Sequence, residues 1–157
     1  MKATITDDHA WLHALVGEWQ SQMPCPDGNG LLTGTERVTR LGEAWLLLEG
    51  RGSMPDGTPT HTLMTLGYDP AQRAFVGSWV GSMMNHLWVY RGGALDAARR
   101  VLALPSEGPA FDGTGRIVPY RDEIEVVGAD ERLLHGNAQQ PDGRWLRFMT
   151  ARYTRIG

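Results

Sequence analysis

The sequence predicts an all-β fold, in which about ten antiparallel strands follow one short N-terminal helix and form a meander barrel. Glycine is the first indication: the 157 residues include 20 glycines, well above the usual share of about 7%, and tight turns require glycine. The second is the alternation of apolar and polar residues, which is typical of half-buried strands. The third is the shortness of the connections, because parallel strands need crossovers of a dozen or more residues. Closing the meander into a barrel would also remove its exposed edges.

A short helix is expected near the N-terminus. Thr6 or Asp7 can cap its first turn, because a side-chain oxygen at that position accepts a hydrogen bond from a free backbone N–H group. Trp11 and Leu15 then fall on one face of the helix, and Gly17 ends it. We expect this helix to close or flank the open end of the barrel through Trp11 and Leu15.

Beyond the helix, the apolar positions recur at every second residue. Turn-forming residues separate the segments, and the two Pro-Asp-Gly sequences at 55–57 and 141–143 are examples in which proline and glycine favour the backbone angles of a turn. The second of them joins the last two segments, so this pair is predicted to be a hairpin. The predicted strands are 16–23, 33–40, 44–52, 60–68, 74–80, 85–91, 100–104, 116–127, 132–139 and 144–155.

Composition excludes several classes of partner. The net charge is -3 and acids and bases are mixed along the chain, so there is no basic stripe of the kind that nucleic-acid phosphates demand. The only cysteine, Cys25, rules out an internal disulfide and favours a reducing compartment. The N-terminal residues lack the apolar run of a signal peptide, and no segment is long and apolar enough for a membrane helix. We therefore expect a cytoplasmic protein without a nucleic-acid or membrane partner.

Four sequence motifs point to a known family. The Gly-x-Trp motif that opens the first strand matches the start of calycin barrels, the group that includes lipocalins and fatty-acid-binding proteins. Taken together, the motifs resemble the bacterial family of proteins of unknown function DUF1579, and the resemblance covers nearly the whole chain. It implies one calycin-like β-barrel domain over residues 1–157, and it implies no activity. The motifs are His9-x-x-Leu12-x-x-Leu15-Val16-Gly17-x-Trp19, Leu41-Gly42-x-x-Trp45-Leu46, Leu66-Gly67-Tyr68-Asp69-Pro70 and Tyr153-Thr154-Arg155.

The same resemblance implies a role for Trp19. In calycins this tryptophan plugs one end of the barrel beneath a cationic side chain of the last strand, here Arg147, Arg152 or Arg155. Haem-binding barrels of the nitrobindin type use a histidine late in the chain, whereas the last strand here contains none and His135 lies one strand earlier. The sequence therefore gives no support for haem.

Aromatic residues suggest a binding cavity. A pocket for an apolar or planar molecule needs an aromatic lining with a few polar groups, although aromatic rings also fill small barrels. Trp79 shares a strand face with Phe75 and Gly77, and the glycines at 77 and 81 would leave room beside it. His86, Trp88 and Tyr90 share a second face. The predicted ligand-binding residues are Trp45, His61, Trp79, His86, Trp88 and Tyr90.

The five histidines are candidate metal ligands. His9 and His13 have the i, i+4 spacing of a zinc site, but no third ligand is evident, and a solvated helix face is the favoured interpretation. His61, His86 and His135 come from three predicted strands and could meet inside the barrel as a zinc or iron site. Coincidence is the favoured interpretation of this set as well.

Charged and nucleophilic residues give weaker indications. Arg37 and Glu49 lie on adjacent predicted strands and could orient a ligand carboxylate if they faced inwards, although a surface pair is favoured. Ser78 is misplaced for a nucleophile elbow, and Cys25 lies in a loop with no base nearby. No catalytic residue and no cofactor is therefore assigned.

We expect a small-molecule binding barrel for an apolar or aromatic ligand. Two alternatives stay open: a metal- or haem-dependent enzyme that uses the barrel histidines, and a structural or dimerising domain whose barrel is filled by side chains. A cavity below about 300 Å³, which is the lower bound of common ligand pockets, would favour the filled barrel.

Overall fold

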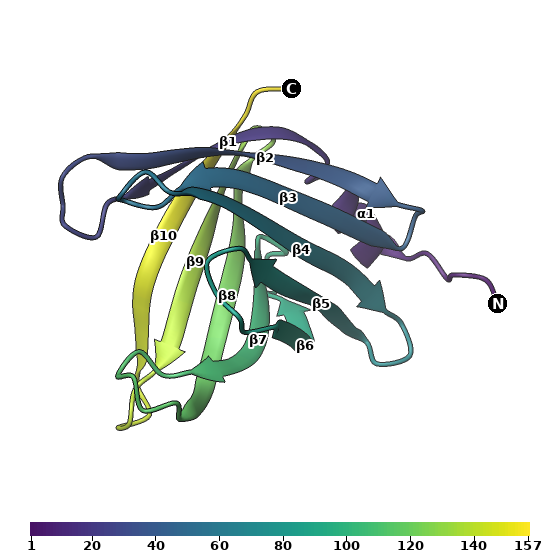
Figure 1. Ribbon diagram of the computed structural model, residues 1–157. Helices are drawn as coiled ribbons and strands as arrows, with labels where there is room; N and C mark the ends of the chain where they lie inside the picture. The colour runs from purple at the N-terminus through teal and green to yellow at the C-terminus, as the bar shows by residue number, and fades with distance from the viewer.

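The computed structural model is a closed barrel of ten antiparallel strands, in which neighbours in sequence pair and β1 meets β10 at the seam. Figure 1 shows this winding, from β1 in purple to β10 in yellow. The structure describes residues 1–157. The predicted all-β barrel with a short N-terminal helix is confirmed. The strands are β1 (Gly17–Pro24), β2 (Leu31–Leu41), β3 (Trp45–Ser53), β4 (Pro59–Asp69), β5 (Ala74–Gly81), β6 (Trp88–Leu95), β7 (Val101–Pro109), β8 (Ile117–Gly128), β9 (Glu131–Gln139) and β10 (Trp145–Arg155).

Strand β6 differs from its prediction because two glycines do not end it. It covers Trp88–Leu95 in place of 85–91, with Gly92 and Gly93 inside the strand. The register with β5 shifts between Phe75 and Gly77, and Gly92 adopts a φ of 68°, a left-handed value that costs glycine little. Arg91 and Gly92 therefore form a β-bulge opposite Val76, and the two glycines do not form a turn.

Strand β7 is longer than predicted, because it runs through two prolines. It covers Val101–Pro109 in place of 100–104. Its pairing with β6 is limited to Ala94 opposite Ala103 and Leu95 opposite Leu102, whereas its pairing with β8 continues to the end. Proline lacks an N–H group and is tolerated where one edge of a strand is free. The segment from Pro105 onward is such an edge.

The helix α1 (Asp7–His13) begins with the predicted cap. Thr6 is the N-cap, and His9 occupies the position at which a capping box normally has Glu or Gln. The Thr6 backbone N–H donates to His9 Nδ1 at 3.0 Å, and the imidazole packs edge-on against Tyr68. The interpretation of His9 as part of a solvated helix face is therefore wrong, because the cap and Tyr68 bury it to 1% exposure. No helix in the structure is long and apolar enough to span a membrane.

The helix covers one end of the barrel, behind β3 and β4 in Figure 1. Leu12, Leu15 and Trp19 are buried there, and Trp19 Nε1 donates to the Leu15 carbonyl at 2.9 Å. The Arg155 guanidinium lies 4.3 Å from the centre of the Trp19 ring, which is within cation–π range, and it donates to the Val16 carbonyl. Of the three cationic residues expected above Trp19, Arg155 is the one found there.

Candidate ligand-binding site

The interior of the barrel changes in character along its axis. On β3, Leu46 and Leu48 are fully buried near the helix, whereas Gly50 and Gly52, the next two residues on the same face, line a cavity. The strand thus stops filling the barrel half-way along, and the space that leucine side chains would occupy stays empty. The inward-facing residues of β4 follow the same order, with Leu66, Met64, Thr62 and Thr60.

The cavity has a volume of about 210 Å³ and opens at the end of the barrel away from α1. Trp79 lines it, as predicted, together with aliphatic and hydroxyl side chains. The volume is below the range of about 300–1,000 Å³ that is usual for ligand pockets, which is the outcome associated above with a filled barrel. The structure is intermediate: the helix end is filled and the other end is hollow. The polar side chains that face the cavity are Ser21, Glu36, Thr60, Thr62 and Tyr153.

A second, shallower hollow of about 540 Å³ lies at the rim and is lined by aromatic rings. His86 meets Trp88 edge-on at 4.7 Å between ring centres, and Trp88 meets Tyr120 at 4.8 Å. Phe111 continues the series against Tyr120 and is 68% exposed. Trp88 and Trp79 are direct partners across β5 and β6. The aromatic hollow and the cavity are therefore adjacent.

The predicted ligand-binding residues divide into three groups, which lie at the two hollows, in the core and on the outer face. Trp79 lines the cavity, and His86 and Trp88 line the aromatic hollow. Tyr90 is buried in the barrel core. The remaining two, Trp45 and His61, precede the inward-facing Leu46 and Thr62 and lie on the outer face, where both are exposed.

The positions of Trp45 and His61 are a correction to the prediction. An alternating pattern identifies two faces of a strand without stating which face is inside. At Trp45 the large ring suggests the core, but it packs across the outer surface of Gly67. His61 lies on the outer face of β4, and its backbone N–H donates to Ser82 Oγ.

The barrel histidines do not converge. His61 and His135 point outwards, and His86 lies at the rim, where its Nε2 contacts the Glu107 carbonyl oxygen at 2.9 Å. No group of three His, Cys, Asp or Glu side chains has the arrangement of a metal site. The hypothesis of a zinc or iron site from His61, His86 and His135 is therefore wrong.

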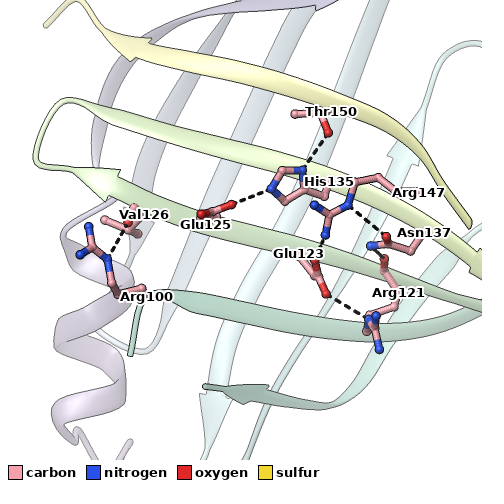
Figure 2. A network of polar contacts seen from close by, with 9 residues as sticks. All are labelled: Arg100, Arg121, Glu123, Glu125, Val126, His135, Asn137, Arg147 and Thr150. Atoms are coloured by element: carbon pink, nitrogen blue, oxygen red, sulfur yellow. Dashed lines mark hydrogen bonds and ion pairs between the residues drawn. The ribbon is translucent and has the colours of Figure 1, made fainter. Parts of the chain in front are cut away.

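His135 belongs to a polar network on the outer face of β8, β9 and β10. Its two ring nitrogens contact Glu125 at 2.7 Å and Thr150 at 2.8 Å, as Figure 2 shows. In the same network Arg147 bonds Glu123 at 2.5 Å. These rows of opposite charges across neighbouring strands hold the sheet together. Arg37 has a similar role on β2, where its exposed side chain pairs with Glu18 at 2.7 Å.

Charged groups lie inside the barrel as well, beneath the cavity. Arg132 is only 2% exposed, and its guanidinium lies 4.0 Å from the centre of the Tyr153 ring and 4.7 Å from that of Trp19. It forms an ion pair with Glu36, which satisfies the need of a buried charge for a partner. Burial, with a further contribution from Glu36, raises the pKa of Tyr153. The floor of the cavity is therefore polar.

A second buried polar pair joins β6 and β8. The Tyr90 hydroxyl donates to Asp122 at 2.5 Å. Burial raises the pKa of Asp122 to about 6, although the hydrogen bond from Tyr90 opposes this shift. Burial also raises the pKa of Tyr90. The pair thus includes a carboxyl group that titrates near neutral pH.

Sequence reasoning missed Glu36, Asp122, Arg132 and Tyr153 as interior residues. Charged residues on an alternating strand are normally assigned to solvent. The alternation itself carried the signal, because three of these residues stand two positions from an aliphatic residue on the same face. Those aliphatic neighbours are Val38, Ile124 and Leu134.

Comparison with solved structures supports the fold. The chain is similar to a de novo designed fluorescence-activating β-barrel, with 13% sequence identity and a TM-score of 0.50 over 97% of this chain and 100% of the other. It is similar to EF1p2_mFAP2b, solved bound to DFHBI, with 12% identity and a TM-score of 0.50 over 94% and 98% of the two chains. The comparison with curated proteins gives no match.

The sequence motifs noted above are explained by one further comparison. The family model described as "Protein of unknown function (DUF1579)" matches residues 4–155, which span α1 and all ten strands. The chain therefore belongs to the protein family DUF1579.

Proposed function

We propose that the chain binds a small apolar or aromatic molecule in the open half of its barrel, against the ring of Trp79. The change of inward-facing side chains on β3 and β4, from leucine and methionine to glycine and threonine, carries the proposal. An unfilled interior is costly, since a core that loses a leucine-sized side chain loses about 2–5 kcal/mol. A ligand that occupies the hollow would restore part of this burial.

The dimensions of the two hollows set the form of the ligand. A cavity of about 210 Å³ holds one or two fused rings and not a long acyl chain. A larger molecule would extend past the Trp79–Trp88 pair into the aromatic hollow. Edge and face contacts with aromatic rings favour planar ligands.

The similarity to designed barrels is consistent with this proposal. One of them is a fluorescence-activating barrel and the other was solved with DFHBI, so a barrel of this shape can accommodate a small molecule. The proposed setting is the cytoplasm, for which the single cysteine, Cys25, is the supporting feature.

Filling the cavity tests the proposal. Gly52 lines the cavity and has only ordinary van der Waals contacts around its Cβ position, the nearest being 3.4 Å to the Thr60 hydroxyl. The Cβ of a Gly52→Leu side chain would therefore fit without a clash with the backbone, and the leucine would take up part of the ligand volume. Gly128→Leu is the matched control, because nothing lies within 4 Å of its Cβ position and it is far from the cavity.

The measurement is a calorimetric titration with naphthalene as the probe. We expect saturable binding to the wild type and to Gly128→Leu, and a loss of at least about tenfold in affinity for Gly52→Leu, equivalent to about 1.4 kcal/mol. Equal affinity of Gly52→Leu and the wild type would place the probe elsewhere and contradict the proposal. A wild-type protein that does not bind naphthalene would also contradict the proposal.

A further inference from the structure

The carboxylate of Glu36 is the one acidic group in the lining of the cavity. It points inwards from β2, two residues from the buried Val38, and its side chain is 12% exposed. Arg132 donates to one of its oxygens, Oε1. A carboxylate can accept several hydrogen bonds through both of its oxygens, so Oε2 remains free to accept one from a molecule in the cavity.

The partner of Glu36 is held behind it. Arg132 does not line the cavity, because its guanidinium lies against the rings of Trp19 and Tyr153. A ligand at the cavity floor therefore meets the negative member of the ion pair first.

The remaining polar lining groups are compatible with a ligand that donates hydrogen bonds. Ser21, Thr60 and Thr62 contribute hydroxyl oxygens, which can accept hydrogen bonds. The one cationic residue of the lining, Arg51, occupies an outward-facing, exposed position on β3. Trp79 lines the same space, and the face of a tryptophan ring attracts both aromatic rings and cations.

We propose that the ligand carries an amino group that donates to Glu36, so that the barrel selects aromatic amines over aromatic carboxylates. This inference rests on the proposed function. A buried ammonium group needs a charged or hydrogen-bonding partner, and Glu36 supplies one. A carboxylate in the same place would face the charge of Glu36 at short range in a medium of low dielectric constant.

Three probes with a common ring separate this inference from the proposed function. Naphthalene tests binding in the cavity, and 2-naphthylmethylamine and 2-naphthoate test the role of charge. At neutral pH we expect the amine to bind at least about tenfold tighter than the carboxylate, since charge-assisted hydrogen bonds are the strong ones. If naphthalene binds, but the carboxylate binds as tightly as the amine or more tightly, this inference is overturned and the proposed function stands. If none of the probes binds, both proposals fall.

Two variants assign the selectivity to Glu36. In Glu36→Gln the preference for the amine over the carboxylate should fall to within about threefold, because the formal charge is lost. Glu49→Gln is the matched control: Glu49 is an exposed residue on the outer face of the adjacent strand, and the preference should be unchanged. An unchanged preference in Glu36→Gln would overturn the inference.

Glu36→Gln leaves Arg132 without its charged partner, which can prevent folding. Tyr153→Phe is therefore the second variant, since it keeps the ring against Arg132 and removes the hydroxyl from the cavity floor. It should weaken the binding of the amine by about threefold, the value of a modest hydrogen bond, and leave naphthalene unaffected. Equal affinity of this variant and the wild type for the amine would contradict a polar contact at the floor.

Discussion

The two halves of this barrel use the same strands for different purposes. In the half beneath α1, inward-facing aliphatic and aromatic residues from every part of the sheet fill the interior, and Trp19 is enclosed by two arginines. In the other half the same strands present glycine, serine and threonine to a cavity of about 210 Å³. A meander barrel can thus concentrate its stability at one end. The other end is then free to remain hollow.

The transition between the halves is gradual and can be located on single strands. On β4 it lies between Met64, which is buried, and Thr62, and on β3 between Leu48 and Gly50. The charged groups Glu36 and Arg132 occupy this boundary. The boundary therefore serves as the floor of the cavity and as the top of the core.

The largest expected effect is on stability in the filled half. Leu66 is completely buried, so Leu66→Ala should lower the free energy of unfolding by about 2–5 kcal/mol. Thr60→Ala, nearer the rim on the same strand and the same face, should lower it by less than about 1 kcal/mol. Urea unfolding of both variants measures the difference. Similar losses would contradict the division of the barrel into a filled and a hollow half.

The second effect depends on pH and arises at Asp122. Its pKa is about 6 in the folded state against 3.8 for the free group, so the folded state binds the proton more tightly. The stabilisation from this proton is complete below pH 4 and is lost as the pH rises through 6. At pH 8 the charged carboxylate then costs about 2–3 kcal/mol, at 1.36 kcal/mol for each pKa unit.

Asp122→Asn tests this account, because an amide keeps an acceptor for the Tyr90 hydroxyl and never carries the charge. It should be more stable than the wild type at pH 8, and the advantage should shrink as the pH falls towards 4. Urea unfolding at several pH values checks this. A wild type that is the more stable protein at pH 8 would show that the carboxylate is well solvated.

The smallest effects are expected on the outer face. His61 is exposed on β4, so His61→Ala should change the stability by no more than about 0.5 kcal/mol and leave the affinity for naphthalene unchanged.

Trp79→Ala should weaken that affinity by about tenfold, because an aromatic pair contributes about 0.5–1.5 kcal/mol beyond the apolar area that it buries. A larger effect of His61→Ala on binding would reverse the assignment of the two faces.

Much of the fold could be predicted from the sequence, because the residues that indicate a strand, a turn or a helix cap lie close together in the chain. Alternation placed the strands, and Thr6 placed the start of the helix. The predicted end at Gly17 was wrong, because the helix ends at His13 and Gly17 opens β1. The predicted bounds of β6 and β7 were wrong because glycine and proline each have two structural roles in a sheet. In both strands the commoner role, that of ending a strand, was assigned. Gly92 forms a bulge and not a turn, and Pro105 lies on a free strand edge.

The site was less predictable, because inside and outside are properties of the closed barrel. Trp79 and Trp88 were found from their aromatic character and from the neighbours on their strand faces, and both line a hollow. Trp45 and Glu36 show the opposite case: the large ring lies outside over Gly67 and the charge lies inside. Glu36 is tolerated there because Arg132, 96 residues later, supplies the compensating charge, and no local pattern predicts such a pair.

The central claim is that the hollow half binds ligands and the filled half does not. The most direct test is to map amide chemical shifts by NMR during a titration with naphthalene. The account predicts shifts of Gly34, Gly50, Gly52 and Thr62, which line the cavity, and none of Leu12, Leu15 or Leu66 beneath the helix. Shifts confined to the outer face, or saturation without any change at these four cavity residues, would contradict it.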